Sequence, residues 1–194
     1  MKKWNGSAWV EPEVMKWDGS KWVVLNQQKY TTTWDSTWTQ TYRSTGDKRT
    51  DDRGGKLCQG DSGLDPWGIN RSLAGFGNIK SELSGAVIND VKLYLRSEHW
   101  WYYAGGTVVI GYHDHSSVPT KFSVSKSDAK RQKFDSRGQA QWIDMPIALG
   151  EGIRDGKYKG ISIYINSTNK DYYGIFNGAK DGSYKPKLKI TYTK

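Results

Sequence analysis

The alternation of apolar and polar positions is the strongest structural signal in this chain, and it is clearest close to the last residue. In residues 187–192, Leu188, Ile190 and Tyr192 alternate with two lysines and a threonine, which is the period of a strand that buries one face. Residues 86–97 show a similar but less regular pattern. We therefore predict a half-buried strand at each of these places.

Six further segments are predicted to be short strands, because each is a brief apolar or β-branched run between turn-forming residues. They are residues 56–59, 71–76, 107–112, 141–145, 159–166 and 173–177. Residues 30–42 are dense in Thr and Trp, which suit a pleated surface, and residues 44–55 predict a polar loop. Helical periodicity is confined to residues 79–83 and 147–153. The pattern predicts an all-β protein, built as a jelly-roll β-sandwich.

A short repeat fills the first 23 residues. Residues 4–10 and 17–23 both read Trp-Asx-Gly-Ser-x-Trp-Val, with a period of 13 residues. Asn-Gly and Asp-Gly tolerate the positive φ angles of two-residue hairpin turns, so we predict two tight β-hairpins with indoles beside each turn. A segment this short cannot bury four indoles by itself. The predicted anchoring contacts are Trp4, Trp9, Trp17 and Trp22.

Hydrophobic periodicity is lost in residues 25–29, which predicts a linker between a β-hairpin anchor in residues 1–28 and a β-sandwich in residues 30–194. A Trp repeat before a polar tether and a larger β domain resembles the amino-terminal end of tail-associated proteins of bacteriophages and prophages. The resemblance implies a virion component that is made in the host cytoplasm and contacts other virion proteins. Its position is left open between tail fibre, tail tip, collar and head decoration, and a homotrimer is one expected assembly.

A second resemblance covers residues 56–192. The runs Arg-Ser-Leu-Ala-Gly-Phe at 71–76, Leu-Ser-Gly-Ala-Val-Ile at 83–88 and Val-Lys-Leu-Tyr-Leu at 91–95 resemble the core of DNRLRE-type, carbohydrate-binding-module-like jelly rolls. Residues 173–176 and 185–192 are similar to the last two strands of that family. An aromatic block between residues 98 and 106 departs from the pattern. The resemblance implies a jelly roll and, as an alternative function, a non-catalytic module that recognises a bacterial surface glycan.

Aromatic rings next to polar groups are the candidate glycan contacts, because flat rings stack on sugar faces while polar neighbours fix hydroxyls. The candidate glycan-binding residues are Trp67, His99, Trp100, Trp101 and Tyr103. Within a strand, alternate members of the block face opposite sides, so packing in the core or between subunits is the favoured alternative for it. Trp67 is predicted to be the more exposed ring. Trp34 and Trp38 are predicted to share one strand face as packing residues.

Two motifs suggest catalysis or metal binding, but neither is complete. Residues 60–63 read Gly-Asp-Ser-Gly, like the nucleophile segment of trypsin-like proteases, yet all three histidines follow the serine. His113 and His115 would share a strand face, but two ligands make a weak metal site. We therefore predict a non-enzymatic protein with no cofactor and no such metal site. A structural calcium ion is the alternative that we keep, at the Asn and Asp residues 166, 169, 171, 177 and 181.

Charge and composition exclude several partners. The net charge of +9 is spread over the chain beside acidic residues, so no nucleic-acid partner is expected, although attraction to anionic polymers stays open. Ten Trp, twelve Tyr and four Phe compensate for a low aliphatic content. Cys58 is the single cysteine, so no intrachain disulfide forms. No apolar run near 18 residues and no secretory pattern are visible, so no membrane association is expected.

Overall fold

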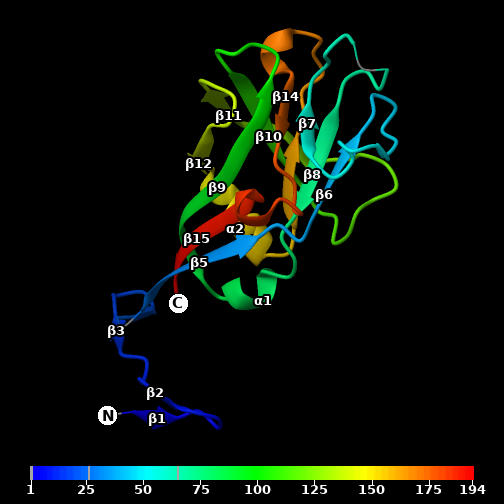
Figure 1. Cartoon of the computed structure of the whole chain (residues 1–194). Helices are drawn as coiled ribbons and strands as arrows, with labels where there is room; N and C mark the ends of the chain where they lie inside the picture. The colour runs from blue at the N-terminus through cyan, green and yellow to red at the C-terminus, as the bar shows by residue number, and fades with distance from the viewer. Residues whose placement is uncertain (1, 26, 65) are drawn as a thin grey trace.

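The computed structural model describes residues 2–25, 27–64 and 66–194, and its main body consists of two antiparallel sheets (Figure 1). The five-stranded sheet has the order β11 (Lys126–Phe134), β10 (Gly106–His113), β13 (Gly160–Ile163), β8 (Arg71–Gly75) and β6 (Trp38–Tyr42). The six-stranded sheet has the order β5 (Lys29–Asp35), β15 (Lys187–Thr193), β9 (Val87–Trp100), β14 (Gly174–Phe176) and β7 (Leu57–Gln59), with β12 (Ala140–Asp144) also paired to β9. The predicted all-β sandwich class is confirmed.

Helical structure is sparse and gathers mainly at one end of the sandwich. The short helix α1 (Lys80–Leu83) contacts α2 (Ile147–Arg154), and α2 packs against β9. Both lie where the sequence predicts helical turns. Gly150 approaches β9 so closely that a Cβ there would lie 2.7 Å from Val91 Cγ2. The glycine that weakens the helical prediction therefore allows the helix to pack closely on the sheet. The two 3₁₀ turns are η1 (Lys170–Tyr172) and η2 (Gly182–Tyr184).

The core lies between the two sheets and depends on the alternation seen in the sequence. Leu188, Ile190 and Tyr192 of β15 are buried, as predicted. Leu188 pairs with Leu93 of β9, and both side chains belong to the main hydrophobic cluster. The last strand of the chain is thus an interior strand, with β5 on one side and β9 on the other.

Residues 30–42 form two strands that belong to different sheets. Trp34 lies in β5 and Trp38 in β6, so the prediction that they share one strand face is wrong. The chain crosses between the sheets at Ser36 and Thr37. Their backbone N–H groups donate to the carbonyl oxygens of Pro186 and Gly75, both at 2.8 Å. Strand alternation says nothing about such a crossing, because the residues on both sides of it have high β propensity.

Strand β11 was not predicted from the sequence. Its nine residues include four basic ones, and Ala129 and Phe134 are its only apolar residues. The strand lies at the outer edge of the five-stranded sheet. An edge strand with charged side chains needs little apolar alternation, and the charges oppose pairing with another chain.

The outer face of the five-stranded sheet is covered by the loop of residues 114–125. Phe122 packs edge-on against Tyr42 and Tyr164, with ring centroids 5.8 and 5.3 Å apart. The Tyr42 hydroxyl donates to the Pro119 carbonyl at 2.9 Å. This cover places His113, which points to that side of the sheet, out of contact with solvent.

The two N-terminal hairpins are formed by β1 (Lys3–Trp4) with β2 (Trp9–Val10), and by β3 (Met15–Trp17) with β4 (Trp22–Val24). The predicted hairpins are present, but their turns are centred one residue later than predicted. Gly6 and Gly19 have the positive φ values, 103° and 104°, whereas Asn5 and Asp18 do not. Each Asx side chain instead accepts hydrogen bonds from backbone N–H groups two and three residues ahead, at 2.9–3.0 Å. Asx side chains commonly stabilise turns in this way.

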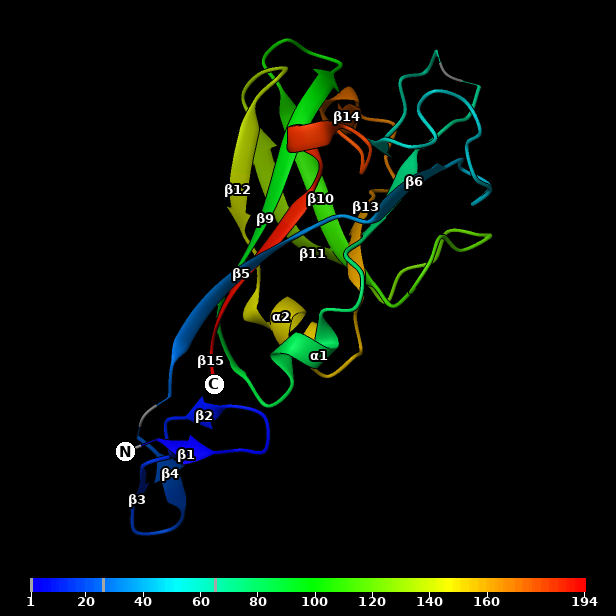
Figure 2. The same ribbon diagram turned by 60° about the horizontal axis from the view of Figure 1, so that its bottom comes forward.

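The hairpins lie next to the start of β5 and outside the two sheets in both views (Figures 1 and 2). Ladder pairing of the sandwich begins before the predicted boundary at residue 30. The backbone of Gln28 exchanges two hydrogen bonds with that of Lys194, at 2.9 and 3.0 Å. Asn26, inside the predicted linker, and Met1, inside the predicted anchor, lie outside the described residues.

Candidate functional site

A hollow at the end of the six-stranded sheet brings part of the aromatic block together with the polar loop that precedes β7. We call it the aromatic hollow, and its volume is about 470 Å³. The described residues that line it are Arg49, Asp51, Asp52, Arg53, Ser62, Leu64, Pro66, His99, Trp101 and Tyr173. Leu64, on this lining, is 83% exposed. The hollow thus combines apolar surface, aromatic rings and charged groups, which is the usual composition of a ligand site.

The end of β9 decides which rings reach the hollow. Strand alternation turns Trp100 into the core and His99 to the opposite side, where His99 pairs with Ile175 of β14. The strand then ends, and Trp101 packs against a small second cluster formed by Cys58, Tyr173 and Ile175. The Trp101 backbone N–H donates to the Tyr173 carbonyl at 3.1 Å. His99 and Trp101 therefore meet Tyr173 at one wall.

Tyr173 is the central ring of this wall. Its ring centroid lies 5.8 Å from that of His99 and 6.2 Å from that of Trp101, both in edge-on contacts. The Tyr173 hydroxyl accepts a hydrogen bond from Arg53 Nη1 at 2.8 Å. The Lys170 ammonium lies 5.2 Å from the centre of the Trp101 ring. These contacts hold the rings in fixed orientations, which lowers the entropy cost of binding a ligand.

Charged groups of the hollow are held in place by an internal ion pair. Arg49 is buried, and its guanidinium donates to Asn70 Oδ1 at 2.7 Å and pairs with Asp51 at 2.5 Å. The hydrogen bond from Arg49 keeps the pKa of Asp51 below its usual value. Burial, with the nearby Arg137 and Arg53 guanidinium groups, lowers the pKa of His99. Because its imidazole is neutral at pH 7, it can both donate and accept, as a sugar hydroxyl does.

The structure separates the five predicted glycan contacts. Only His99 and Trp101 line the aromatic hollow. Trp100 is fully buried, against Phe134 and Phe176 at centroid distances of 6.0 and 5.3 Å, so its inclusion among glycan contacts is corrected to a core role.

Trp67 and Tyr103 both lie outside the lining of the hollow. Trp67 is half-buried, and the guanidinium of Arg43 lies 3.9 Å from its ring centre, so it is less exposed than predicted. Tyr103 is 79% exposed, with the Arg137 guanidinium 4.0 Å from its ring centre. Sequence reasoning missed Tyr173 and the arginines of residues 49–53. The sequence predicts only a polar loop at these arginines. The one sequence feature that could have indicated a site there is the high density of charged residues just before a buried strand.

His113 and His115 serve the fold in this structure. Their rings stack with centroids 5.4 Å apart. His113 Nε2 lies 3.0 Å from the Ala74 carbonyl oxygen, and its Nδ1 accepts from the His115 backbone N–H at 3.1 Å. Burial lowers the pKa of His113 to about 4. Both ring nitrogens are used, so this imidazole is a neutral structural group.

In the described ranges, no group of three or more His, Cys, Asp or Glu residues is arranged to hold a metal ion. Three of the five predicted calcium ligands have other partners through their side chains. Asn169 caps η1 through Asp171 N–H at 3.0 Å, while Asp181 pairs with Lys56 at 2.8 Å. Asn177 donates to Glu98 at 2.6 Å.

The segment of residues 60–63 forms a turn. Gly60 and Gly63 have φ values of 76° and 73°, and Asp61 Oδ1 accepts from Gly63 N–H at 2.7 Å. Ser62 is buried, and its Oγ accepts from the Leu64 N–H at 3.1 Å. The turn carries Ser62 and Leu64 into the lining of the aromatic hollow.

The hairpins form a second candidate site, because their indoles are exposed. Trp4, Trp9, Trp17 and Trp22 expose 51%, 65%, 50% and 62% of their surface. In each hairpin the two indoles are cross-strand partners in edge-on contact, with centroids 5.7 and 5.8 Å apart and interplanar angles of 61° and 63°. The sequence repeat is therefore also a repeat of geometry, and it presents the same pair of rings twice.

Comparison with known proteins gives no family: no protein-family model matches the chain, and no curated protein matches it significantly. Among the described residues, no helix combines the length and the apolar character that crossing a bilayer requires.

Proposed function

We propose that the protein is a structural and adsorption component of a phage virion, which attaches through its Trp hairpins and displays the β-sandwich outward. The observation that carries the proposal is the exposure of all four repeat indoles, in a segment that lies outside the two sheets. Exposed apolar groups of this size usually mark an interaction surface. Tryptophan is also one of the residue types enriched among those that dominate binding energy at interfaces.

The hairpins have little stability of their own, which supports an attachment role. An isolated two-stranded hairpin is marginal in water. Each hairpin here has only two or three residues per strand, an Asx-stabilised turn and one indole pair. A partner surface that covers the indoles would both stabilise the hairpins and bury their apolar area. Assignment of that partner to a virion rests on the resemblance of the repeat to tail-associated proteins. It implies other virion proteins as partners and synthesis in the host cytoplasm.

Removal of residues 1–27 is expected to leave a folded sandwich that no longer joins the particle, because the ladder begins at Gln28 and excludes the hairpins. Light scattering after size exclusion would compare the whole chain with residues 28–194, and co-purification with virions would measure attachment. Trp142→Ala is a matched control, since Trp142 is 39% exposed on the sandwich itself. A truncated chain that still co-purifies with virions would refute the anchor.

A second candidate function, recognition of a bacterial surface glycan, is supported by the aromatic hollow. Its edge-on rings, the neutral His99 and the fixed Asp51 carboxylate offer stacking area together with hydrogen-bond donors and acceptors. Such a combination suits a sugar, which has both C–H faces and hydroxyl groups. In this proposal the sandwich supplies recognition while the hairpins supply attachment.

Trp101→Ala is expected to weaken glycan binding about tenfold or more, because loss of a stacking ring at a binding surface commonly costs over 1 kcal/mol. Binding to arrayed wall and capsule glycans would be measured with the whole chain. His99→Gln, which keeps hydrogen-bonding capacity, should have a smaller effect, and Trp142→Ala should have none. Glycan binding that Trp101→Ala leaves unchanged would remove the hollow as the site.

A further inference from the structure

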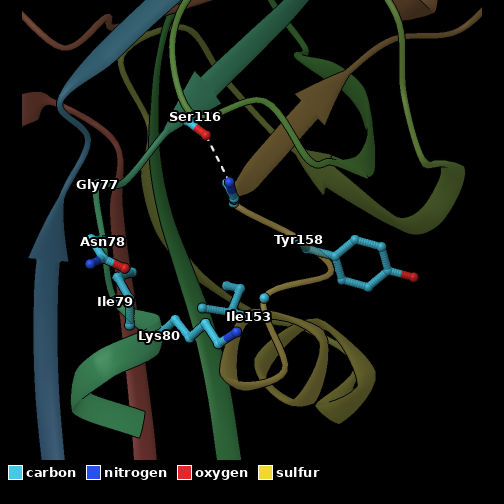
Figure 3. Close-up of a pocket in the computed structure, with 9 residues that line it drawn as sticks. Gly77, Asn78, Ile79, Lys80, Ser116, Ile153 and Tyr158 are labelled. Carbon is cyan, nitrogen blue, oxygen red and sulfur yellow. Dashed lines mark hydrogen bonds between the residues drawn. The ribbon is translucent and has the colours of Figure 1, made fainter. Parts of the chain in front are cut away.

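A second pocket lies at the other end of β9, between the two helices and the loop that follows β10. We call it the lysine pocket, and its volume is about 480 Å³. The residues that line it are Gly77, Asn78, Ile79, Lys80, Ser116, Ile153, Gly156, Tyr158 and Lys159. In Figure 3, Lys80 and Ile153 point toward the same space, a dashed line marks a hydrogen bond of Ser116, and the ring of Tyr158 points away.

The floor of this pocket is formed by core residues, and two positions of its wall are glycines, which place no side chain in the pocket. Ile79 and Ile153 are each 3% exposed and belong to the main hydrophobic cluster. Gly77 and Gly156 have φ values of 75° and 80°, which glycine adopts without strain. A Cβ at residue 156 would lie 2.9 Å from Lys80 Nζ. The pocket is thus part of the rigid body of the sandwich.

Two ammonium groups give the pocket a positive charge. Lys159 Nζ donates to Ser116 Oγ at 2.7 Å, and a hydroxyl does not neutralise its charge. The pKa of Asp155 is lowered, first by its hydrogen bond with Arg154 and to a smaller extent by the charge of Lys80. Arg154 holds the Asp155 carboxylate at 2.7 Å, so this acid is engaged outside the pocket. None of the described lining residues carries a carboxylate.

We propose that the lysine pocket binds a phosphate group carried on a small polyol or sugar. Lysine ammonium groups bind phosphate oxygens as point charges, and the Ser116 hydroxyl adds a third donor. The Asn78 amide offers a donor and an acceptor to polyol hydroxyls, while Ile79 and Ile153 contact the carbon chain. The volume lies in the range of small-molecule sites. This site uses neither the hairpins nor the aromatic hollow, so it goes beyond the functions proposed above.

The probe for this proposal is glycerol 3-phosphate, titrated into the whole chain by calorimetry or ligand-observed NMR. We expect saturable binding, with inorganic phosphate weaker and glycerol without effect, because the phosphate supplies the charge and the polyol supplies additional contacts. Lys80→Gln and Lys159→Gln should each weaken binding about tenfold or more, since each removes a charge-assisted hydrogen bond. Lys126→Gln, on the edge strand β11, is the matched control and should change affinity less than twofold.

The proposal would be overturned by the absence of saturable binding of glycerol 3-phosphate to the whole chain. It would also be overturned by an equal loss with Lys126→Gln, which would mean nonspecific attraction to a chain of charge +9. Ser116→Ala removes the hydroxyl donor and keeps both ammonium groups, so it should weaken binding less than either lysine variant. A loss as large as that of the lysine variants would contradict the assignment of the phosphate to the two ammonium groups. Binding unaffected by both lysine variants would place the ligand elsewhere and refute the site.

Discussion

Replacing Trp100 with alanine is expected to lower the free energy of unfolding by about 3–5 kcal/mol, the range for truncation of a large buried aromatic residue. The ring is fully buried between Phe134 and Phe176. Two glycines shape its site: a Cβ at Gly106 or Gly174 would lie 2.5 or 2.6 Å from the indole. A ring fitted this closely leaves a cavity when it is removed, because both sheets limit collapse around it.

Urea denaturation of residues 28–194 would measure this loss as a lower midpoint at an unchanged slope. Trp101→Ala is the natural comparison, since the neighbouring indole is only half-buried and should cost less than half as much stability. The two substitutions are expected to change different properties: Trp100→Ala lowers stability, and Trp101→Ala weakens the proposed glycan binding. Equal midpoints for the wild type and Trp100→Ala would contradict the core role of Trp100.

Stability is expected to fall by about 3 kcal/mol as the pH decreases from 6.5 to 4, because of His113 alone. Burial holds the pKa of its imidazole at about 4, against 6.5 for an ordinary histidine. Between these values the unfolded chain binds a proton that the folded chain does not, so lowering the pH favours unfolding. The contribution is fully present above pH 6.5 and is lost as the pH falls toward 4. The lowered pKa of His99 acts in the same direction.

Chemical denaturation at several pH values between 7.5 and 4.5 would test this dependence. His113→Gln should be less stable than the wild type at pH 7.5 and should show a flatter pH profile, because the titrating ring is gone. His115→Gln is the control: it removes the neighbouring ring, leaves His113 buried, and should keep most of the slope. A wild-type profile that is flat from pH 7.5 to 4.5 would mean that His113 is accessible to protons in the folded protein.

Much of the sandwich could be predicted because most of its strands carry a local signal. The last strand, predicted at residues 187–192, is Lys187–Thr193, and the strand predicted at 71–76 is Arg71–Gly75. Alternation is a local property, so it finds strands whose one face meets the core. It failed at β11, whose charged edge position requires no such face, and at the crossing between β5 and β6, which is set by tertiary packing.

The candidate site was less predictable, because it depends on a strand end and on a long loop. Alternation correctly divides the aromatic block into core and surface, yet it cannot tell that β9 stops at Trp100 and leaves Tyr102 and Tyr103 exposed. The contact between Arg53 and Tyr173 joins residues 120 positions apart. Only the complete fold brings such a pair together. The hairpins are the opposite case, since every contact that defines them is local.

Because β15 lies between β5 and β9, the six-stranded sheet cannot be completed until β15 has been synthesised. A ribosome releases β5 and β9 long before the seven residues that must enter between them. Until then the nascent six-stranded sheet has two unpaired edges facing an empty strand position, and the aliphatic side chains of β9 lack their partners. The hairpins close from neighbouring residues alone and can form as soon as they emerge. The Trp hairpins are thus formed early, whereas the sandwich is completed only after β15 has been synthesised.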